Sequence, residues 1–268
     1  LGEPIRNYGI AGSSVNCAYR RALRVGKTES ATEYVVLNIF DDDHIRSIDG
    51  CRWIRLAWDS QVDPGVVRHL SSLPWAHVRY DLDRGEFVDR PGACPNVDAL
   101  RALSDPDHFY ETFKDDVVVK LFVIGIGGDA DVEEAEALAD RFNVDVDFKD
   151  PDRRRPDAWK LYQAYGLKST PYIIEKLRQH LNEEGRKLMI QLSYSAHHIE
   201  KTLNGEPRFD QEFIDYMDTN DFVYVDTAVK FVEDYKKYNL TVLDYLKQFY
   251  ILPTGSAIFG HFNPMANL

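Results

Sequence analysis

Apolar residues along this chain follow two spacings, one typical of buried strands and one typical of helices. Residues 33–40, 187–192 and 222–226 are runs rich in β-branched, aromatic and other apolar side chains. Runs of this kind predict strands that are buried in a parallel sheet. Residues 171–184 and 210–219 instead place apolar side chains three and four positions apart, which predicts amphipathic helices. The pattern therefore predicts strands and helices in alternation.

The N-terminal residues begin a similar unit. A short strand is expected at residues 4–10, followed by a turn at Gly12 and a helix that contains Ala18 and Val25. Gly185 stands where a helix C-cap is expected after the helix at 171–184. Strands and helices in this order favour an α/β fold, with a parallel sheet and right-handed crossovers.

Residues 50–165 interrupt this alternation. A hairpin is expected from residues 77–80 and 86–88, which flank a turn that contains a glycine. Residues 110–128 fit either a strand or a helix, and their apolar stripe favours the helix. The predicted organisation is a core of residues 1–49 and 166–268, with residues 50–165 as an inserted cap of mixed structure.

Composition excludes several classes of function. The chain has 268 residues, of which 44% are hydrophobic, and a net charge of −12. No apolar run approaches the roughly 20 residues of a membrane helix, so a soluble globular protein is expected. The acidic balance argues against a nucleic-acid partner. Cys17, Cys51 and Cys94 lack the spacing of a zinc site, and no metal or cofactor is predicted.

Polar residues gather where the predicted strands end. The turn at residues 7–13, the acidic run from Asp41 to His44, and His261 each follow a predicted strand region. The carboxyl ends of parallel strands are where α/β sheets bind ligands. A glycine turn that donates amides and a histidine that transfers protons suit an acyl-transfer site, provided that a nucleophile is near.

Three segments resemble conserved blocks of the SGNH (GDSL-type) hydrolases. Asn7-x-Gly9-Ile10-x-Gly12 is similar to the second block, residues 35–46 resemble the third, and His261-Phe262-Asn263-Pro264-x-Ala266-Asn267 resembles the last. Strand 222–226 is similar to the strand that precedes the last block. The resemblance covers residues 1–49 and 171–268. It implies a three-layer α/β/α fold with a parallel sheet, similar to flavodoxin.

The resemblance implies a serine-type ester hydrolase or acyltransferase that acts on a small-molecule or carbohydrate O-acyl ester. His261 would be the general base and the Gly12 amide would stabilise the oxyanion. Asp43 stands at the position of the oxyanion asparagine, and Asp226 is a candidate for the acid that orients the histidine. The Gly-Asp-Ser block is absent and is expected before Leu1. The chain is therefore expected to be an inactive fragment, without the C-terminal helix and with any secretion signal lost upstream.

Departures from the family leave an alternative. An ionised Asp43 would repel a developing oxyanion, and Ile258 and Phe259 stand where the family has its orienting acid. The alternative is a catalytically inactive SGNH-fold module that binds carbohydrate or protein.

Two further readings concern ligands. The run from Asp41 to His44 is read as a solvated turn rather than a cation site. Phosphate binding at residues 125–128 is opposed by the acidic residues that follow. A loop is expected at His197 and His198. Substrate, oligomeric state and compartment are left open.

Overall fold

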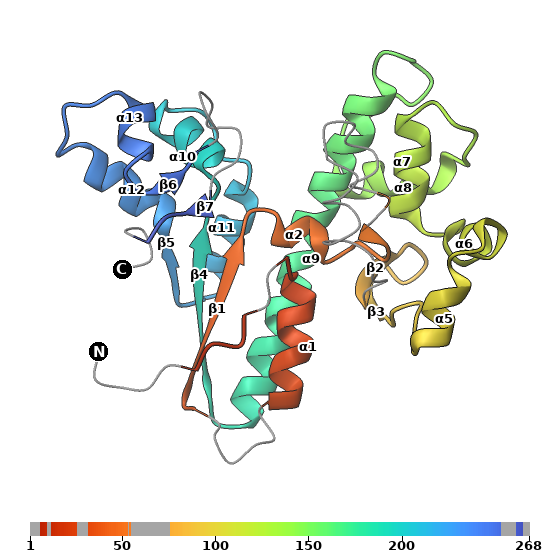
Figure 1. Cartoon of the computed structure of the whole chain (residues 1–268), viewed down its shortest axis with the longest axis horizontal. Helices are drawn as coiled ribbons and strands as arrows, with labels where there is room; N and C mark the ends of the chain where they lie inside the picture. Colours follow the sequence, from red (N-terminus) through yellow and green to blue (C-terminus); the bar gives the residue numbers. More distant parts are fainter. Residues whose placement is uncertain are drawn as a thin grey trace. The chain divides into compact units, whose positions relative to one another are not determined.

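The computed structural model describes residues 6–9, 12–25, 32–52, 54, 76–252 and 261–264, and only the backbone of His261. The chain divides into two compact units. Unit 1 comprises residues 1–27 and 43–176, and unit 2 comprises residues 28–42 and 177–268. Figure 1 labels their elements. Whether residues 50–165 form an inserted cap stays a prediction.

Unit 1 is mainly helical and also contains one antiparallel hairpin. Its elements are α1 (Val15–Val25), α2 (Asp43–Arg46), β2 (His77–Asp81), β3 (Glu86–Arg90), α5 (Val97–Ala102), α6 (Pro106–Phe113), α7 (Val117–Gly125), α8 (Glu133–Phe142) and most of α9 (Arg154–Glu183).

Unit 2 is a mixed α/β structure around a parallel sheet. Its elements are β1 (Tyr34–Phe40), the end of α9, β4 (Lys187–Ser193), α10 (Ala196–Leu203), α11 (Gln211–Thr219), β5 (Tyr224–Asp226), α12 (Thr227–Tyr235), α13 (Val242–Leu246), β6 (Tyr250–Ile251) and β7 (His261–Phe262).

The sheet has the order β1-β4-β5, and both strand pairs are parallel (Figure 1). Tyr34 lies opposite Lys187, and Leu192 lies opposite Asp226, so all three strands end at the same edge. This confirms the predicted α/β class and its parallel sheet. The expectation that the 33–40 strand is buried on both faces is wrong, because Tyr34 and Val36 are 54% and 59% exposed. Burial alternates along β1, which lies at the edge of the described sheet.

Helix α9 is longer than the sequence pattern predicts. The expected helix began near Pro171, but α9 starts at Arg154 and continues through that proline. A proline inside a helix removes one hydrogen bond and costs about 3 kcal/mol. A continuous buried stripe on both sides of Pro171 offsets that cost, from Ala158, Leu161 and Tyr165 to Ile173, Ile174, Leu177 and Leu181. The end is as predicted, since Gly185 has φ +70° and Arg186 N donates to the Leu181 carbonyl at 2.8 Å.

The predicted hairpin is confirmed and packs by its aromatic side chains. Gly85 in its turn has φ +69°, a conformation that glycine adopts without strain. The ring of Tyr80 lies edge-on to Phe87 and Phe142, each at a centroid distance of 5.1 Å. The hydroxyl of Tyr165 on α9 accepts a hydrogen bond from Tyr80 N at 2.8 Å. Tyr80 is therefore part of the core of unit 1.

The glycine-rich segment 125–128 ends a helix and follows no strand. It closes α7, because Gly127 has φ +78° and Gly128 N donates to the Val123 carbonyl at 2.9 Å. The strand-to-helix turn that a phosphate site would require is absent here. At the N-terminus, residues 6–9 are in no helix or strand, and the rest of the strand expected at 4–10 lies outside the described residues.

Candidate functional site at the carboxyl edge of the sheet

The three parallel strands of unit 2 end in polar residues that bond to one another. Ser195 follows β4, and its backbone N–H donates to Asp41 Oδ2, just after β1, at 2.8 Å. Thr227 follows β5, and its hydroxyl donates to the Leu192 carbonyl of β4 at 2.8 Å. These bonds hold the three strand ends together and leave several titratable side chains at one edge, where α/β sheets bind ligands.

Asp41 is the most strongly perturbed carboxyl group at this edge. Its side chain is 8% exposed, and burial raises its pKa to about 6, against the opposing effect of its hydrogen bonds with Ser195. His198 on α10 lies with its Nε2 atom 3.7 Å from Asp41 Oδ2. Burial lowers the pKa of His198 to about 4, helped by His197 and Lys201. At neutral pH an ionised Asp41 therefore lies beside an uncharged imidazole.

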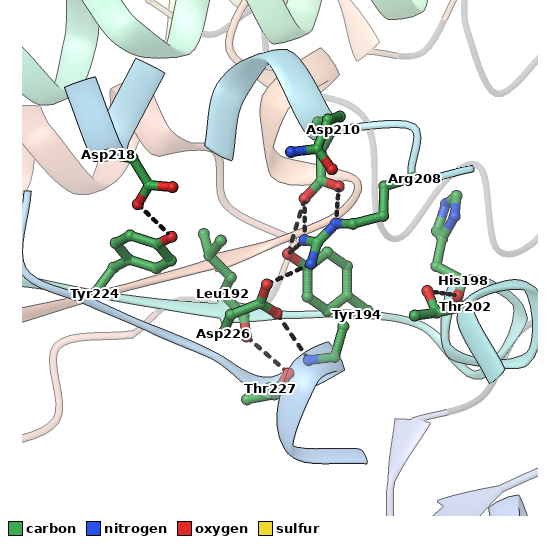
Figure 2. Close-up of polar contacts among 12 residues, drawn as sticks. Leu192, Tyr194, His198, Thr202, Arg208, Asp210, Asp218, Tyr224, Asp226 and Thr227 are labelled. Carbon is green, nitrogen blue, oxygen red and sulfur yellow. Dashed lines mark hydrogen bonds and ion pairs between the residues drawn. The ribbon is translucent and has the colours of Figure 1, made fainter. Parts of the chain in front are cut away.

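A second polar cluster surrounds Arg208 (Figure 2). The guanidinium donates two hydrogen bonds to Asp210, each at 3.0 Å, one to Asp226 and one to the Tyr194 hydroxyl at 2.6 Å. Tyr194 in turn donates to Asp210 at 2.8 Å. Burial alone would lower the pKa of Arg208, but its hydrogen bonds and the nearby charges outweigh burial and raise it. The cluster ties the loop before α11 to the ends of β4 and β5.

A pocket of about 80 Å³ lies between α10, the loop before α11 and the start of α12. Its lining residues are Tyr194, His198, Lys201, Thr202, Glu206, Pro207, Arg208, Phe209, Asp210 and Ala228. The pocket and the edge of the sheet share His198, because this side chain contacts Asp41 and also lines the pocket. A concave site with a few convergent polar groups is the usual form of a small-molecule site.

The structure connects two of the expected site segments, both in unit 1. Gly12 has φ +67°, and its carbonyl accepts a hydrogen bond from Arg52 Nη1 at 2.7 Å. Arg46 Nη1 donates to the Ser13 carbonyl at 3.4 Å and to Asp43 Oδ1 at 2.9 Å. One arginine therefore joins the Gly12–Ser13 turn to Asp43, which begins α2.

Asp226 and His261 are both in unit 2. Asp226 caps α12, with Oδ1 accepting from Ala228 N at 2.9 Å and Oδ2 bound by Arg208. His261 lies in β7, opposite Ile251 of β6. Two residues after His261, Asn263 is bonded to the segment before β6. Its backbone N–H donates to the Phe249 carbonyl at 2.8 Å, and its side-chain Nδ2 donates to the Gln248 carbonyl at 2.7 Å. The role of Asp226 as orienting acid stays a prediction.

The sequence pattern did not predict several residues of this site. The loop expected at residues 197–198 is wrong, because both histidines lie on α10. The sequence pattern indicated Asp41 only as part of an acidic run at a strand end, and Arg208 and Asp210 belong to no motif. Position alone could have identified Ser195, since it lies just beyond a predicted strand.

Within residues 6–9, 12–25, 32–52, 54, 76–252 and 261–264, no group of three or more His, Cys, Asp or Glu side chains is arranged to hold a metal ion. In the same described residues, no helix is both long enough and apolar enough to cross a membrane. Comparison with models of protein families, with curated proteins and with solved structures found no match. The function of the chain is inferred from its own residues for this reason.

Proposed function

We propose that the chain is part of a serine-type ester hydrolase or acyltransferase of the SGNH type, with a three-layer α/β/α core. In this proposal a serine outside these 268 residues attacks the acyl carbonyl, and His261 accepts its proton and returns it to the leaving alcohol. The amide of Gly12 stabilises the tetrahedral oxyanion.

The observation that carries the proposal is the link that Arg46 makes between the Ser13 carbonyl and Asp43. These two segments are the ones from which the resemblance builds the oxyanion hole, and the link supports their acting together. It also addresses the charge at Asp43. An ion pair at 2.9 Å, with side chains 13% and 17% exposed, offsets the negative charge that would repel an oxyanion.

A second candidate is the catalytically inactive binding module, and the surroundings of Asp226 favour it. Both carboxylate oxygens of Asp226 are occupied, one by Ala228 N and the other by Arg208. A carboxylate held in this way is poorly placed to orient an imidazole as well. The catalytic proposal therefore uses His261 in a serine–histidine dyad, without Asp226.

Hydrolysis of p-nitrophenyl acetate separates the two candidates when the native protein assayed is a longer one that contains both this chain and the proposed serine, and its His261→Ala variant is assayed beside it. The catalytic proposal expects kcat/KM to fall by about 10²–10⁴ in the variant, the usual contribution of a general base. The control is His108→Ala, an exposed histidine on α6, which should retain full turnover. Equal turnover by native protein and His261→Ala rules out the proposed role of His261. Absence of turnover in the longer protein favours the binding module.

Arg46 provides an independent test. Arg46→Leu should lower kcat with little change in KM, and Arg46→Lys should recover part of the loss, because the charge beside Asp43 returns. Unchanged kcat in Arg46→Leu would show that the Asp43 charge does not act on the transition state.

A further inference from the structure

The pocket of unit 2 has an aromatic platform on one side. The rings of His198 and Phe209 lie 4.1 Å apart between centroids, at an interplanar angle of 31°. Phe209 is 39% exposed and the His198 side chain 24% exposed, so part of this platform is open to solvent. The ring of Tyr194 lies edge-on to Phe209, at a centroid distance of 6.3 Å. An exposed aromatic ring beside polar groups is suited to a ligand with one apolar face and a polar rim.

Most of the other lining residues are polar, which disfavours an acyl chain as the ligand. Seven of the ten lining residues carry polar or charged side chains, and only Pro207, Phe209 and Ala228 do not. A hydrocarbon chain here would cover charged groups without offering them hydrogen bonds, which is unfavourable. Donors and acceptors are both present, because Lys201 can donate and Glu206 can accept. The Thr202 hydroxyl donates to the His198 carbonyl at 2.9 Å and can still accept.

The charge balance also disfavours an anion. Arg208 is already held by Asp210 and Asp226, as Figure 2 shows, so its charge is offset within the protein. Glu206 and Asp210 add negative charge to the same lining. Together with Asp226, which binds Arg208 from outside the lining, three carboxylates oppose the two cations Lys201 and Arg208, so one negative charge is in excess.

We propose that this pocket binds one neutral sugar ring, with a C–H face against Phe209 and its hydroxyls directed at Lys201, Thr202 and Glu206. The volume of about 80 Å³ suits part of a single ring rather than an oligosaccharide. The identification of the ring as the alcohol part of an ester rests on the proposed function. Binding of the sugar ring does not depend on that function.

An NMR titration tests the proposal directly. Methyl pyranosides of glucose, galactose, mannose and xylose are added separately to the native protein, and amide shifts are followed. At least one pyranoside should shift amides within residues 194–210 in a saturable manner. Phe209→Ala should weaken that binding roughly tenfold, because the buried ring face is lost, and Phe209→Trp should retain it. The control is Tyr110→Ala, a 64% exposed aromatic of unit 1, which should bind as the native protein does.

Three outcomes overturn the proposal: no pyranoside shifts these amides, Phe209→Ala binds as well as the native protein, or hexanoate or phosphate occupies the site in place of a sugar. Since binding is measured without turnover, the two proposals fail separately. Sugar binding that depends on Phe209 in a protein without esterase activity refutes only the esterase. Esterase activity without sugar binding refutes only the pocket.

Discussion

Removing Arg208 should destabilise unit 2 strongly, because it leaves two buried carboxylates without their cation. In Arg208→Met the side chain keeps much of its apolar volume but loses all five donors. Asp210 and Asp226 have side chains that are only 2% and 8% exposed, so water cannot replace the guanidinium well. Breaking a buried ion pair on one side typically costs about 3–5 kcal/mol, and that is the expected loss in the free energy of unfolding.

The origin of the loss can be tested by neutralising the carboxylates as well. In Arg208→Met/Asp210→Asn/Asp226→Asn no buried charge is left, so most of the lost stability should return. Asparagine at position 226 still accepts from Ala228 N, which preserves the cap of α12. The control is Arg101→Met, whose ion pair with Asp98 has side chains 77% and 91% exposed and should contribute nothing measurable.

Urea unfolding of the four proteins, with amide hydrogen exchange in β4 to report on unit 2, gives the comparison. A loss under about 1 kcal/mol in Arg208→Met, or a triple variant no more stable than the single one, would refute the reasoning.

The remaining predictions concern Asp41, His198 and two glycines. Because burial raises the pKa of Asp41 to about 6, the folded state loses about 2 kcal/mol of stability as the pH rises from 4 to 6. Because the pKa of His198 is lowered to about 4, its contribution has the opposite slope, so native stability should be nearly flat in this range. In denaturant unfolding, Asp41→Asn should lose stability on acidification below pH 6.5, because only the His198 contribution remains. His198→Phe should lose stability as the pH rises, because only the Asp41 contribution remains. The same dependence of unfolding free energy on pH in both variants would contradict this. In thermal unfolding, Gly166→Ala should cost more than about 2 kcal/mol, because the added Cβ would lie 2.7 Å from the Ile45 Cα atom. Gly185→Ala should cost only about 1 kcal/mol, because this residue has φ +70° but open space around it. Equal losses in the two variants would refute the steric argument.

Local patterns identified most of the strands and helices of the core, because each pattern reports on its own residues. The runs at 33–40 and 187–192 became β1 and β4, and the helix at 210–219 became α11. The start of α9 could not be predicted in the same way. Pro171 reads locally as a helix start, and only the packing on both sides of it makes the longer helix favourable.

The candidate site was harder to predict, because its contacts join residues far apart in sequence. Asp41 and Ser195 are separated by 154 positions, and nothing near either residue specifies the bond between them. The sequence does place Asp41 directly after one strand of a parallel sheet and Ser195 shortly after another, which is enough to predict that they share an edge. It does not predict burial, and burial is what moves the pKa of Asp41 to about 6.

The charges near this edge explain why its histidines and carboxylates cannot be assigned roles from sequence alone. Asp226 and Asp210 resemble free acids in the sequence, yet Arg208 from the intervening loop binds both. Asp41 is instead held by the backbone N–H of Ser195, and burial raises its pKa to about 6. Catalytic acids and bases are found where environments separate the pKa values of neighbouring groups. By that criterion Asp41 and His198, of which His198 also lines the pocket, are better candidates for proton transfer in unit 2 than Asp226.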